Sequence, residues 1–200
     1  TLRFDGRRCI HSRHCVLEAP TVFLANTAGA WLHPEASTVE HCVHVAHNCP
    51  SGAITYERHD GGAQEAAPAV NVVRVRENGP YAVHAAITSG GIASFRATLC
   101  RCGGSRNKPY CDGSHATVGF AATGEPPART SPPLAERAGP LSIDPIRNGP
   151  LQLSGNVEIC SGTGHTLLRT QSTRLCRCGA SGTKPFCDGS HARVGFVAEG

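Results

Sequence analysis

The sequence has few aromatic residues and no methionine. Phe, Trp and Tyr make up 5% of its 200 residues, so we expect small hydrophobic cores that need support beyond apolar packing. It has no run of about eighteen apolar residues, which argues against a transmembrane helix. Lysine and arginine are not clustered, so nothing supports nucleic-acid binding. The absence of methionine indicates that the natural start is missing or processed.

The patterns of common catalytic sites are also lacking. The sequence contains no nucleophile paired with a base, no phosphate-binding glycine loop and no dinucleotide fingerprint. We therefore expect that the protein is not an enzyme. Its eleven cysteines are an odd number, and most of them lie in patterns typical of metal ligands. This usage argues against a disulfide framework and indicates a reducing compartment, which we take to be the cytoplasm.

One cysteine-rich segment occurs twice. Residues 100–115 contain three cysteines and one histidine with the spacing C-x-C-x8-C-x3-H, and residues 176–191 repeat that spacing. Three thiolates and an imidazole this close together indicate a small metal centre. The expected ligands are Cys100, Cys102, Cys111 and His115 in the first copy and Cys176, Cys178, Cys187 and His191 in the second.

The spacing leaves two kinds of metal open. Zinc accepts three cysteines and one histidine, which would make the segments structural zinc sites. Zinc ligands usually occur as C-x2-C or C-x4-C pairs, whereas a C-x-C pair suits one iron of a two-iron cluster. In that arrangement Cys100 and Cys102 would bind one iron, and the other iron would be bound by Cys111 and His115.

Both segments resemble the CDGSH iron-sulfur domain, whose signature is C-x-C-x2-S-x3-P-x-C-D-G-S-H. The match includes Ser105, Pro109, Ser181 and Pro185. The resemblance implies a 2Fe-2S cluster in each copy and a role in redox chemistry or cluster transfer. We expect the Asp-Gly turn to lead into a short helix that carries the histidine. Lys108 and Lys184 are either solvated charges or cations beside the cluster.

Residues 1–58 contain a different cysteine pattern. Ferredoxins bind a cubane cluster through C-x2-C-x2-C and a remote cysteine followed by proline. Here Cys9 and Cys15 stand at the outer positions of the triplet, and Ser12 stands at the central one. Cys49, which precedes a proline, is the remote ligand.

This block resembles the divergent mono-cluster ferredoxin domain that is often found beside CDGSH domains. Three thiolates suit a 3Fe-4S cluster, which lacks the iron that the central cysteine would bind. A 4Fe-4S cluster would need Ser12, His11, Cys42 or solvent on its fourth iron. For Cys42 we favour a core position, because it lies at helical spacing with Val39 and Ala46.

The helix around Cys42 is expected to begin at the capping pattern of residues 37–40 and to run toward Asn48. Three histidines on this helix are interpreted as a solvated face rather than a metal site: His41, His44 and His47. Cys160 has no partner at ligand spacing, so we expect it to pack in a core.

The repeat is longer than the ligand motif. In each copy an Asn-Gly-Pro turn separates two predicted strands, at residues 70–76 and 81–85 and again at 141–146 and 151–154. A Val-Gly-Phe segment follows each motif, at 118–120 and 194–196, and we expect it to form a closing strand. The predicted domains are a ferredoxin-like domain at 1–58, CDGSH units at 69–122 and 141–200, and a Pro-rich connector at 123–140.

One CDGSH unit buries little surface and exposes strand edges. Single-domain members of that family pair as symmetric dimers, and a tandem chain can make the same contact within itself. We therefore predict an α+β protein, with a small ferredoxin-like α+β domain followed by two β-rich CDGSH units in an intrachain pseudo-two-fold pair. The protein is expected to be a monomer.

Three functions are compatible with these patterns. The preferred hypothesis is an iron-sulfur protein with two 2Fe-2S clusters and one 3Fe-4S or 4Fe-4S cluster, which exchanges electrons with redox partner proteins. The second is a cluster delivery or repair protein that serves apo iron-sulfur acceptors. The third is a zinc-stabilised interaction module. None of them involves a nucleic acid or a membrane.

Overall fold

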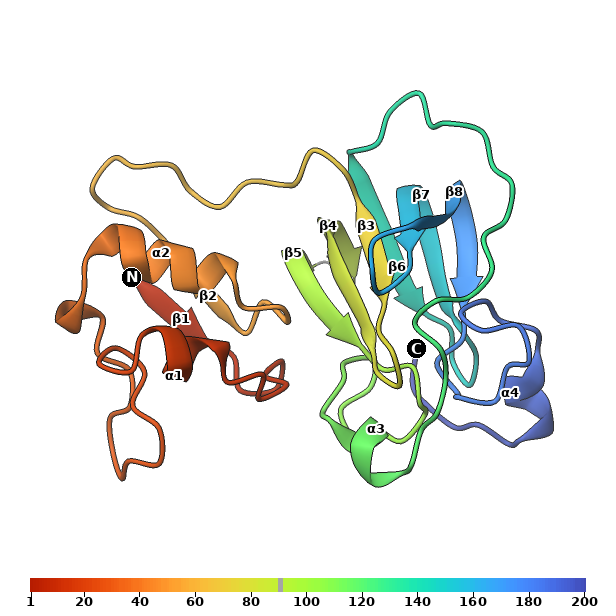
Figure 1. The fold of residues 1–200 in the computed structure, drawn as a ribbon, viewed down its shortest axis with the longest axis horizontal. Coiled ribbons are helices and arrows are strands. Elements are labelled where there is room, and N and C mark those ends of the chain that lie inside the picture. The colour runs from red at the N-terminus through yellow and green to blue at the C-terminus, as the bar shows by residue number, and fades with distance from the viewer. Residues whose placement is uncertain (90–91) are drawn as a thin grey trace. The chain divides into compact units, whose positions relative to one another are not determined.

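The computed structural model describes residues 1–89 and 92–200. The chain divides into two compact units, Thr1–Ala66 and Ala67–Gly200. The first unit mixes helices and strands, and the second is built mainly of strands with short helices (Figure 1). The structure thus belongs to the predicted α+β class.

In the first unit, two helices and a two-stranded sheet share one core. The elements are β1 (Leu2–Phe4), α1 (His14–Glu18), a 3-10 helix (Pro34–Ala36), α2 (Val39–His47) and β2 (Ile54–Tyr56). Strands β1 and β2 are antiparallel. The core includes Phe23, Val45 and Ile54. Cys42 is buried in the same core, which confirms its predicted position.

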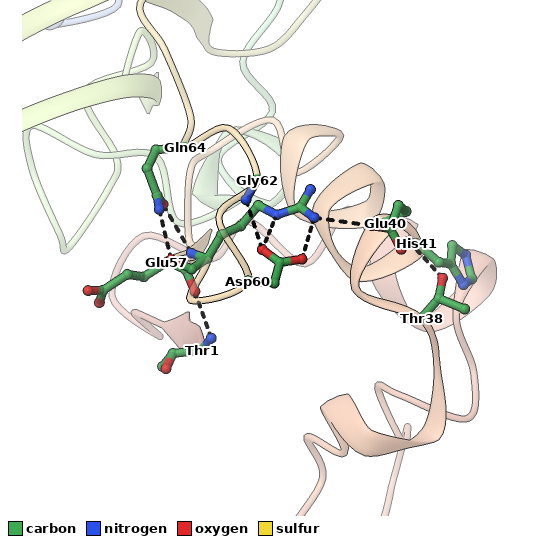
Figure 2. Close-up of polar contacts among 9 residues, drawn as sticks. Thr1, Thr38, Glu40, His41, Glu57, Asp60, Gly62 and Gln64 are labelled. Atoms are coloured by element: carbon green, nitrogen blue, oxygen red, sulfur yellow. Dashed lines mark hydrogen bonds and ion pairs between the residues drawn. The ribbon is translucent and has the colours of Figure 1, made fainter.

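Helix α2 begins one residue later than the capping pattern predicts. Thr38 is its N-cap, and the Thr38 hydroxyl accepts a hydrogen bond from the His41 amide at 3.2 Å (Figure 2). Ser37 has an extended backbone after the 3-10 helix, and its hydroxyl bonds to the His41 ring nitrogen Nδ1 at 2.8 Å. Ser37, the predicted cap, therefore contacts the first turn of the helix through the His41 ring, and Thr38 is the residue that caps the backbone.

The residues after β2 fold back onto the first unit (Figure 2). The Arg58 guanidinium binds the Asp60 carboxylate at 2.5 and 2.8 Å and Glu40 of α2 at 3.1 Å. The Gln64 side chain donates to the Arg58 carbonyl at 2.8 Å. These bonds fasten residues 58–64 to the first unit.

The second unit contains three strands from each copy of the repeat. They are β3 (Val72–Val75), β4 (Tyr81–Ser89), β5 (Ile92–Leu99), β6 (Pro140–Pro145), β7 (Leu151–Cys160) and β8 (Thr166–Leu175). In each copy the first two strands form a hairpin across the Asn-Gly-Pro turn, and the third pairs antiparallel with the second. The strands after each turn are longer than predicted, because their far ends pair with β5 and β8.

Two parallel strand pairs join the copies. Strand β3 pairs with β7, and β6 pairs with β4. In both pairs the first strand of one copy lies beside the second strand of the other copy. The resulting six-stranded sheet has one core with side chains from both copies, including Val73, Ile87, Leu141 and Leu153. Cys160 is also buried in this unit. Neither copy encloses a core of its own.

The Val-Gly-Phe segments do not form the predicted closing strands. Each follows a short helix, α3 (Ser114–Thr117) or α4 (Ser190–Arg193), and residues 118–120 and 194–196 form turns and irregular chain. Gly119 and Gly195 have positive φ angles of 64° and 61°, which turn the chain away from an extended course. The Phe120 and Phe196 amides donate back to carbonyls at 3.1 and 3.0 Å, so they are not available to a sheet.

The connector between the copies lies along the second copy. Residues 121–139 have no helix or strand. The Arg129 amide donates to the Leu167 carbonyl at 2.8 Å. The Arg137 guanidinium binds the buried Glu158 carboxylate at 2.7 Å. These bonds hold an extended segment against β7 and β8.

Candidate metal centres

The first cysteine loop is anchored to the end of β5. The Cys100 amide donates to the Pro109 carbonyl at 2.8 Å, and the Cys111 amide donates to the Thr98 carbonyl at 2.9 Å. Equivalent bonds anchor the second loop to β8. Helices α3 and α4, which follow the loops, lie at the same end of the sheet (Figure 1).

Within each loop the four expected ligands form two close pairs. The Sγ–Sγ separation is 3.8 Å for Cys100 and Cys102 and 3.7 Å for Cys176 and Cys178. The separation between Sγ and Nδ1 is 3.4 Å for both Cys111–His115 and Cys187–His191. The histidines lie on α3 and α4, as the sequence predicts.

These separations fit two ligands per metal ion. Tetrahedral coordination with metal–sulfur and metal–nitrogen bonds of about 2.3 and 2.0 Å places two sulfurs about 3.8 Å apart and a sulfur and a nitrogen about 3.5 Å apart. Over the described residues, no group of three or more His, Cys, Asp and Glu side chains is arranged to hold a single ion. The four ligands of each loop are thus arranged as two pairs, one of two cysteines and one of a cysteine and a histidine.

Backbone amides donate to sulfurs of the first loop, and the pKa of one of them, Cys102, is lowered. The Gly104 amide donates to Cys102 Sγ at 3.3 Å, and the Gly113 amide donates to Cys111 Sγ at 3.4 Å. The hydrogen bond between the first two thiols lowers the pKa of Cys102 to about 6 and raises that of Cys100. Burial raises the pKa of Cys111. A metal ion must bind thiolates, so the amide bonds help the loop to hold negative charge.

The aspartate of each Asp-Gly turn closes its loop. Asp112 accepts hydrogen bonds from the Arg106 amide at 2.8 Å and from the amide of Ser114, the first residue of α3, at 3.0 Å. Burial alone would raise the pKa of Asp112, but the bonds to Ser114 and Arg106 outweigh it and hold the pKa at about 2. Asp188 makes the equivalent bonds. The carboxylate therefore positions the helix that carries the histidine.

The two lysines of the motif face the loop rather than solvent alone. Lys108 Nζ donates to the Ser105 carbonyl at 2.5 Å, and Lys184 Nζ donates to the Ser181 carbonyl at 2.6 Å. Lys108 also lies over the Phe196 ring of the other copy, with Nζ 5.8 Å from the ring centroid. Both ammonium groups thus place a positive charge against the backbone of a ligand loop.

Sequence reasoning missed the arginine between the first two cysteines of each motif. Arg101 and Arg177 are each 1% exposed. The Arg101 guanidinium donates to the Arg76 and Thr123 carbonyls at 2.8 Å and lies 5.5 Å from the Phe120 ring centroid. Burial lowers the pKa of both arginines, but a guanidinium keeps its charge.

Each arginine joins its motif to the Asn-Gly-Pro turn before it and to the segment after it. Arg177 bonds to the Gly149, Ile146 and Glu199 carbonyls at 2.8, 2.6 and 2.9 Å. The sequence does show an arginine at the same position of both copies, directly after the first cysteine, which indicates that this residue has a role. Its role could not be inferred, because its partners lie more than twenty residues away in the chain.

The two ligand loops meet directly. Cys102 and Cys178 form an antiparallel backbone bridge. Gly103 and Gly179 make this approach possible: a Cβ atom on Gly103 would lie 2.6 Å from the Cys178 carbonyl oxygen, and one on Gly179 would lie 2.5 Å from that of Cys102. Both glycines also have positive φ angles.

In the first unit, the structure brings the three expected cysteines to one cavity. Cys9, Cys15 and Cys49 line a cavity of about 590 Å³, and Ser12 and His11 line it as well. Burial, followed by the nearby Cys49 and Cys9, raises the pKa of Cys15. The three cysteines line the same cavity, but in the described chain they are not arranged to hold a single metal ion.

The histidines of α2 bond to separate groups. Within the described chain, His41 bonds to Ser37 at 2.8 Å, His44 to Glu18 at 2.8 Å and His47 to the Tyr56 hydroxyl at 2.8 Å. They are not gathered around one point. Cys42 donates toward the Pro34 carbonyl at 3.8 Å and is not among the residues that line the cysteine cavity.

Comparison with known proteins places both units in families. Residues 69–116 and 148–192 match the family described as iron-binding zinc finger, CDGSH type. Residues 1–59 match the family described as divergent 4Fe-4S mono-cluster. The comparison with curated proteins found no match. In the described part of the chain, no helix has the length and apolar character needed to span a bilayer.

The matched ranges include both copies of the CDGSH motif and the N-terminal cysteines. The chain is therefore an iron-sulfur protein with two CDGSH domains in tandem and an N-terminal domain of the divergent 4Fe-4S mono-cluster family.

Proposed function

We propose that this protein carries electrons by means of three iron-sulfur clusters. The observation that supports it most is the paired arrangement in each CDGSH loop, where two sulfurs lie 3.7–3.8 Å apart and a sulfur and an imidazole nitrogen lie 3.4 Å apart. Each pair suits one iron, so each loop would hold a 2Fe-2S cluster. When bound, such clusters supply one-electron redox chemistry.

The N-terminal domain would hold the third cluster. Cys9, Cys15 and Cys49 are its ligands in this proposal, and Ser12 takes the place of a central cysteine. Three thiolates favour a 3Fe-4S cluster. A 4Fe-4S cluster is the alternative, with Ser12, His11 or solvent on the fourth iron.

The tandem arrangement would replace a dimer of single domains. The equivalent pairings β3–β7 and β6–β4 support a pseudo-two-fold pair of CDGSH units within one chain. In this proposal the protein acts as a monomer in the cytoplasm. It is a carrier rather than an enzyme, and its partners are other redox proteins.

Iron, zinc and acid-labile sulfide analysis of the purified protein, together with EPR spectroscopy, tests the cluster assignment. We expect iron and sulfide in amounts that correspond to three clusters. Zinc without sulfide in a chain that lacks the N-terminal cysteine ligands would contradict the assignment and favour the structural zinc alternative.

Cluster delivery is a second candidate function, and the exposure of the ligands supports it. His115 and His191 are partly exposed, so one ligand in each CDGSH loop is an imidazole that protons can reach. Incubation of the loaded protein with an apo-ferredoxin distinguishes the two functions. Transfer of a cluster supports delivery, and reduction or oxidation without transfer supports electron transfer.

A further inference from the structure

A tyrosine of the first copy reaches into the ligand loop of the second copy. Tyr81 is the first residue of β4 and is fully buried. Its hydroxyl donates to the Cys176 carbonyl at 2.8 Å and to the Pro185 carbonyl at 3.0 Å. Cys176 is an expected ligand, so this contact joins one copy directly to the metal centre of the other.

The hydroxyl connects the two ends of the second ligand loop. The Pro185 carbonyl also accepts the Cys176 amide at 2.9 Å, and Pro185 lies two residues before the ligand Cys187. A donor shared by these carbonyls fixes Cys176 relative to the segment that leads to Cys187. The positions of two ligands therefore depend on one buried hydroxyl group.

The first loop has no such donor at the equivalent position. Leu151 is the first residue of β7 and follows the second Asn-Gly-Pro turn, as Tyr81 follows the first. Tyr81 lies opposite Leu99, and Leu151 lies opposite Leu175, the corresponding residue of the other copy. Leu151 is also fully buried, but its side chain cannot donate a hydrogen bond.

We propose that Tyr81 is a positioning residue for the second metal centre, and that it makes the two CDGSH sites unequal by slowing cluster loss more at the second site than at the first, where its ring lies 5.8 Å from the Arg101 guanidinium. The inference rests on the proposed 2Fe-2S clusters. Its basis is a fully buried hydrogen bond, because removal of the Tyr81 hydroxyl takes a buried donor away from the carbonyl of the ligand Cys176. The ring of Tyr81 fills part of the shared core, so Tyr81→Phe removes the donor while the packing is retained.

The test uses two forms of the full chain, each with one complete CDGSH motif. Cys100→Ser with Cys111→Ser leaves only the second motif complete, and Cys176→Ser with Cys187→Ser leaves only the first. Tyr81→Phe is introduced into each form. Iron and sulfide are measured first, and the loss of visible absorbance at mildly acid pH is then followed. The N-terminal domain is the same in all these chains, so its contribution cancels.

We expect Tyr81→Phe to speed cluster loss about five- to tenfold in the form that keeps the second motif, in line with the loss of a buried hydrogen bond, and to change the rate much less in the form that keeps the first. Tyr56→Phe is the matched control, because it removes a tyrosine hydroxyl from the first unit. It should change neither rate.

Equal acceleration at both sites would show that the hydroxyl only supports the fold, and an unchanged rate at the second site would show that it has no role; either result overturns the inference. In these cases iron and sulfide are still present, so the proposed clusters stand. Zinc without sulfide would overturn the proposed clusters and the inference together. If the serine variants do not fold, Tyr81→Phe alone should accelerate one of the two CDGSH decay phases more than the other in the otherwise unchanged chain. Equal acceleration of both CDGSH phases, or acceleration of neither, overturns the inference.

Discussion

Each CDGSH loop has one histidine where a fourth cysteine would complete a set of thiolates. An imidazole must be unprotonated at the nitrogen that binds a metal, and imidazole is the side chain that titrates between about pH 5 and 8. For the proposed clusters, we therefore expect binding to weaken as the pH falls and protons compete for that nitrogen. His115 and His191, both partly exposed, are the ligands that protons can reach.

We predict that His115→Cys together with His191→Cys removes the fast phase of acid decay of the CDGSH clusters and lowers their reduction potentials, because a further thiolate adds negative charge. Decay of visible absorbance at mildly acid pH and a redox titration measure these effects. Equal decay rates in the variant and the natural protein would show that the histidines are not the labile ligands.

Ser12 decides the type of the N-terminal cluster in the proposed assignment. It lines the cavity that Cys9, Cys15 and Cys49 share, and it stands where ferredoxins have their central cysteine. We predict that Ser12→Cys converts a 3Fe-4S cluster into a 4Fe-4S cluster, with loss of the EPR signal of the oxidised 3Fe-4S form. Cys42→Ala, a change in the core of the same domain, should leave the cluster type unchanged. An unaltered cluster in Ser12→Cys would contradict the ligand assignment.

At the level of the structural elements, a buried arginine holds each ligand loop to the segments on both sides of it. Arg101 donates to carbonyls of the Asn-Gly-Pro hairpin and of the segment after α3. Without the guanidinium these buried carbonyls lose a charged donor. We predict that Arg101→Gln lowers the free energy of unfolding of the second unit by about 3 kcal/mol.

Chemical denaturation followed by circular dichroism measures this loss, and Arg106→Gln is the control. Arg106 lies in the same loop but is exposed, so its replacement should change the stability by less than about 0.5 kcal/mol. Similar effects of the two replacements would show that the buried guanidinium has no special role.

At the scale of the whole second unit, the two ligand loops lie in backbone contact, and Gly103 and Gly179 leave the space for that contact. An alanine at position 103 would place its Cβ 2.6 Å from the Cys178 carbonyl oxygen, and it would also have to adopt a φ of 81°. We predict that Gly103→Ala lowers the stability of the second unit by at least about 2 kcal/mol and weakens cluster retention in both loops.

Gly164→Ala separates the two causes of this loss. Gly164 has a φ of 100°, and a Cβ atom at this position would meet open space, with no contact within 4 Å in the described chain. Its replacement therefore carries the backbone strain without the close contact. We expect it to leave cluster retention unchanged, as measured by iron and sulfide after gel filtration. Normal retention in Gly103→Ala would show that the loops can move apart without consequence.

The local features of this protein could be predicted from its sequence. The ligand residues of each motif lie within about sixteen residues of one another, so spacing alone indicated a metal centre, and the two Asn-Gly-Pro turns marked the hairpins. The burial of Cys42 followed from helical periodicity. In each of these cases the interacting groups are near neighbours in the chain, and short-range geometry limits what they can form.

The tertiary structure decided the features that depend on contacts between distant residues. The parallel pairs β3–β7 and β6–β4, the bonds of Arg101 and Arg177, and the reach of Tyr81 to Cys176 all join segments that the sequence separates. The Val-Gly-Phe segments could equally have been strands; they are not, because their amides bond to the helices before them. A sequence pattern states what each segment can form, but the partner that a buried polar group finds is set only when the whole core packs.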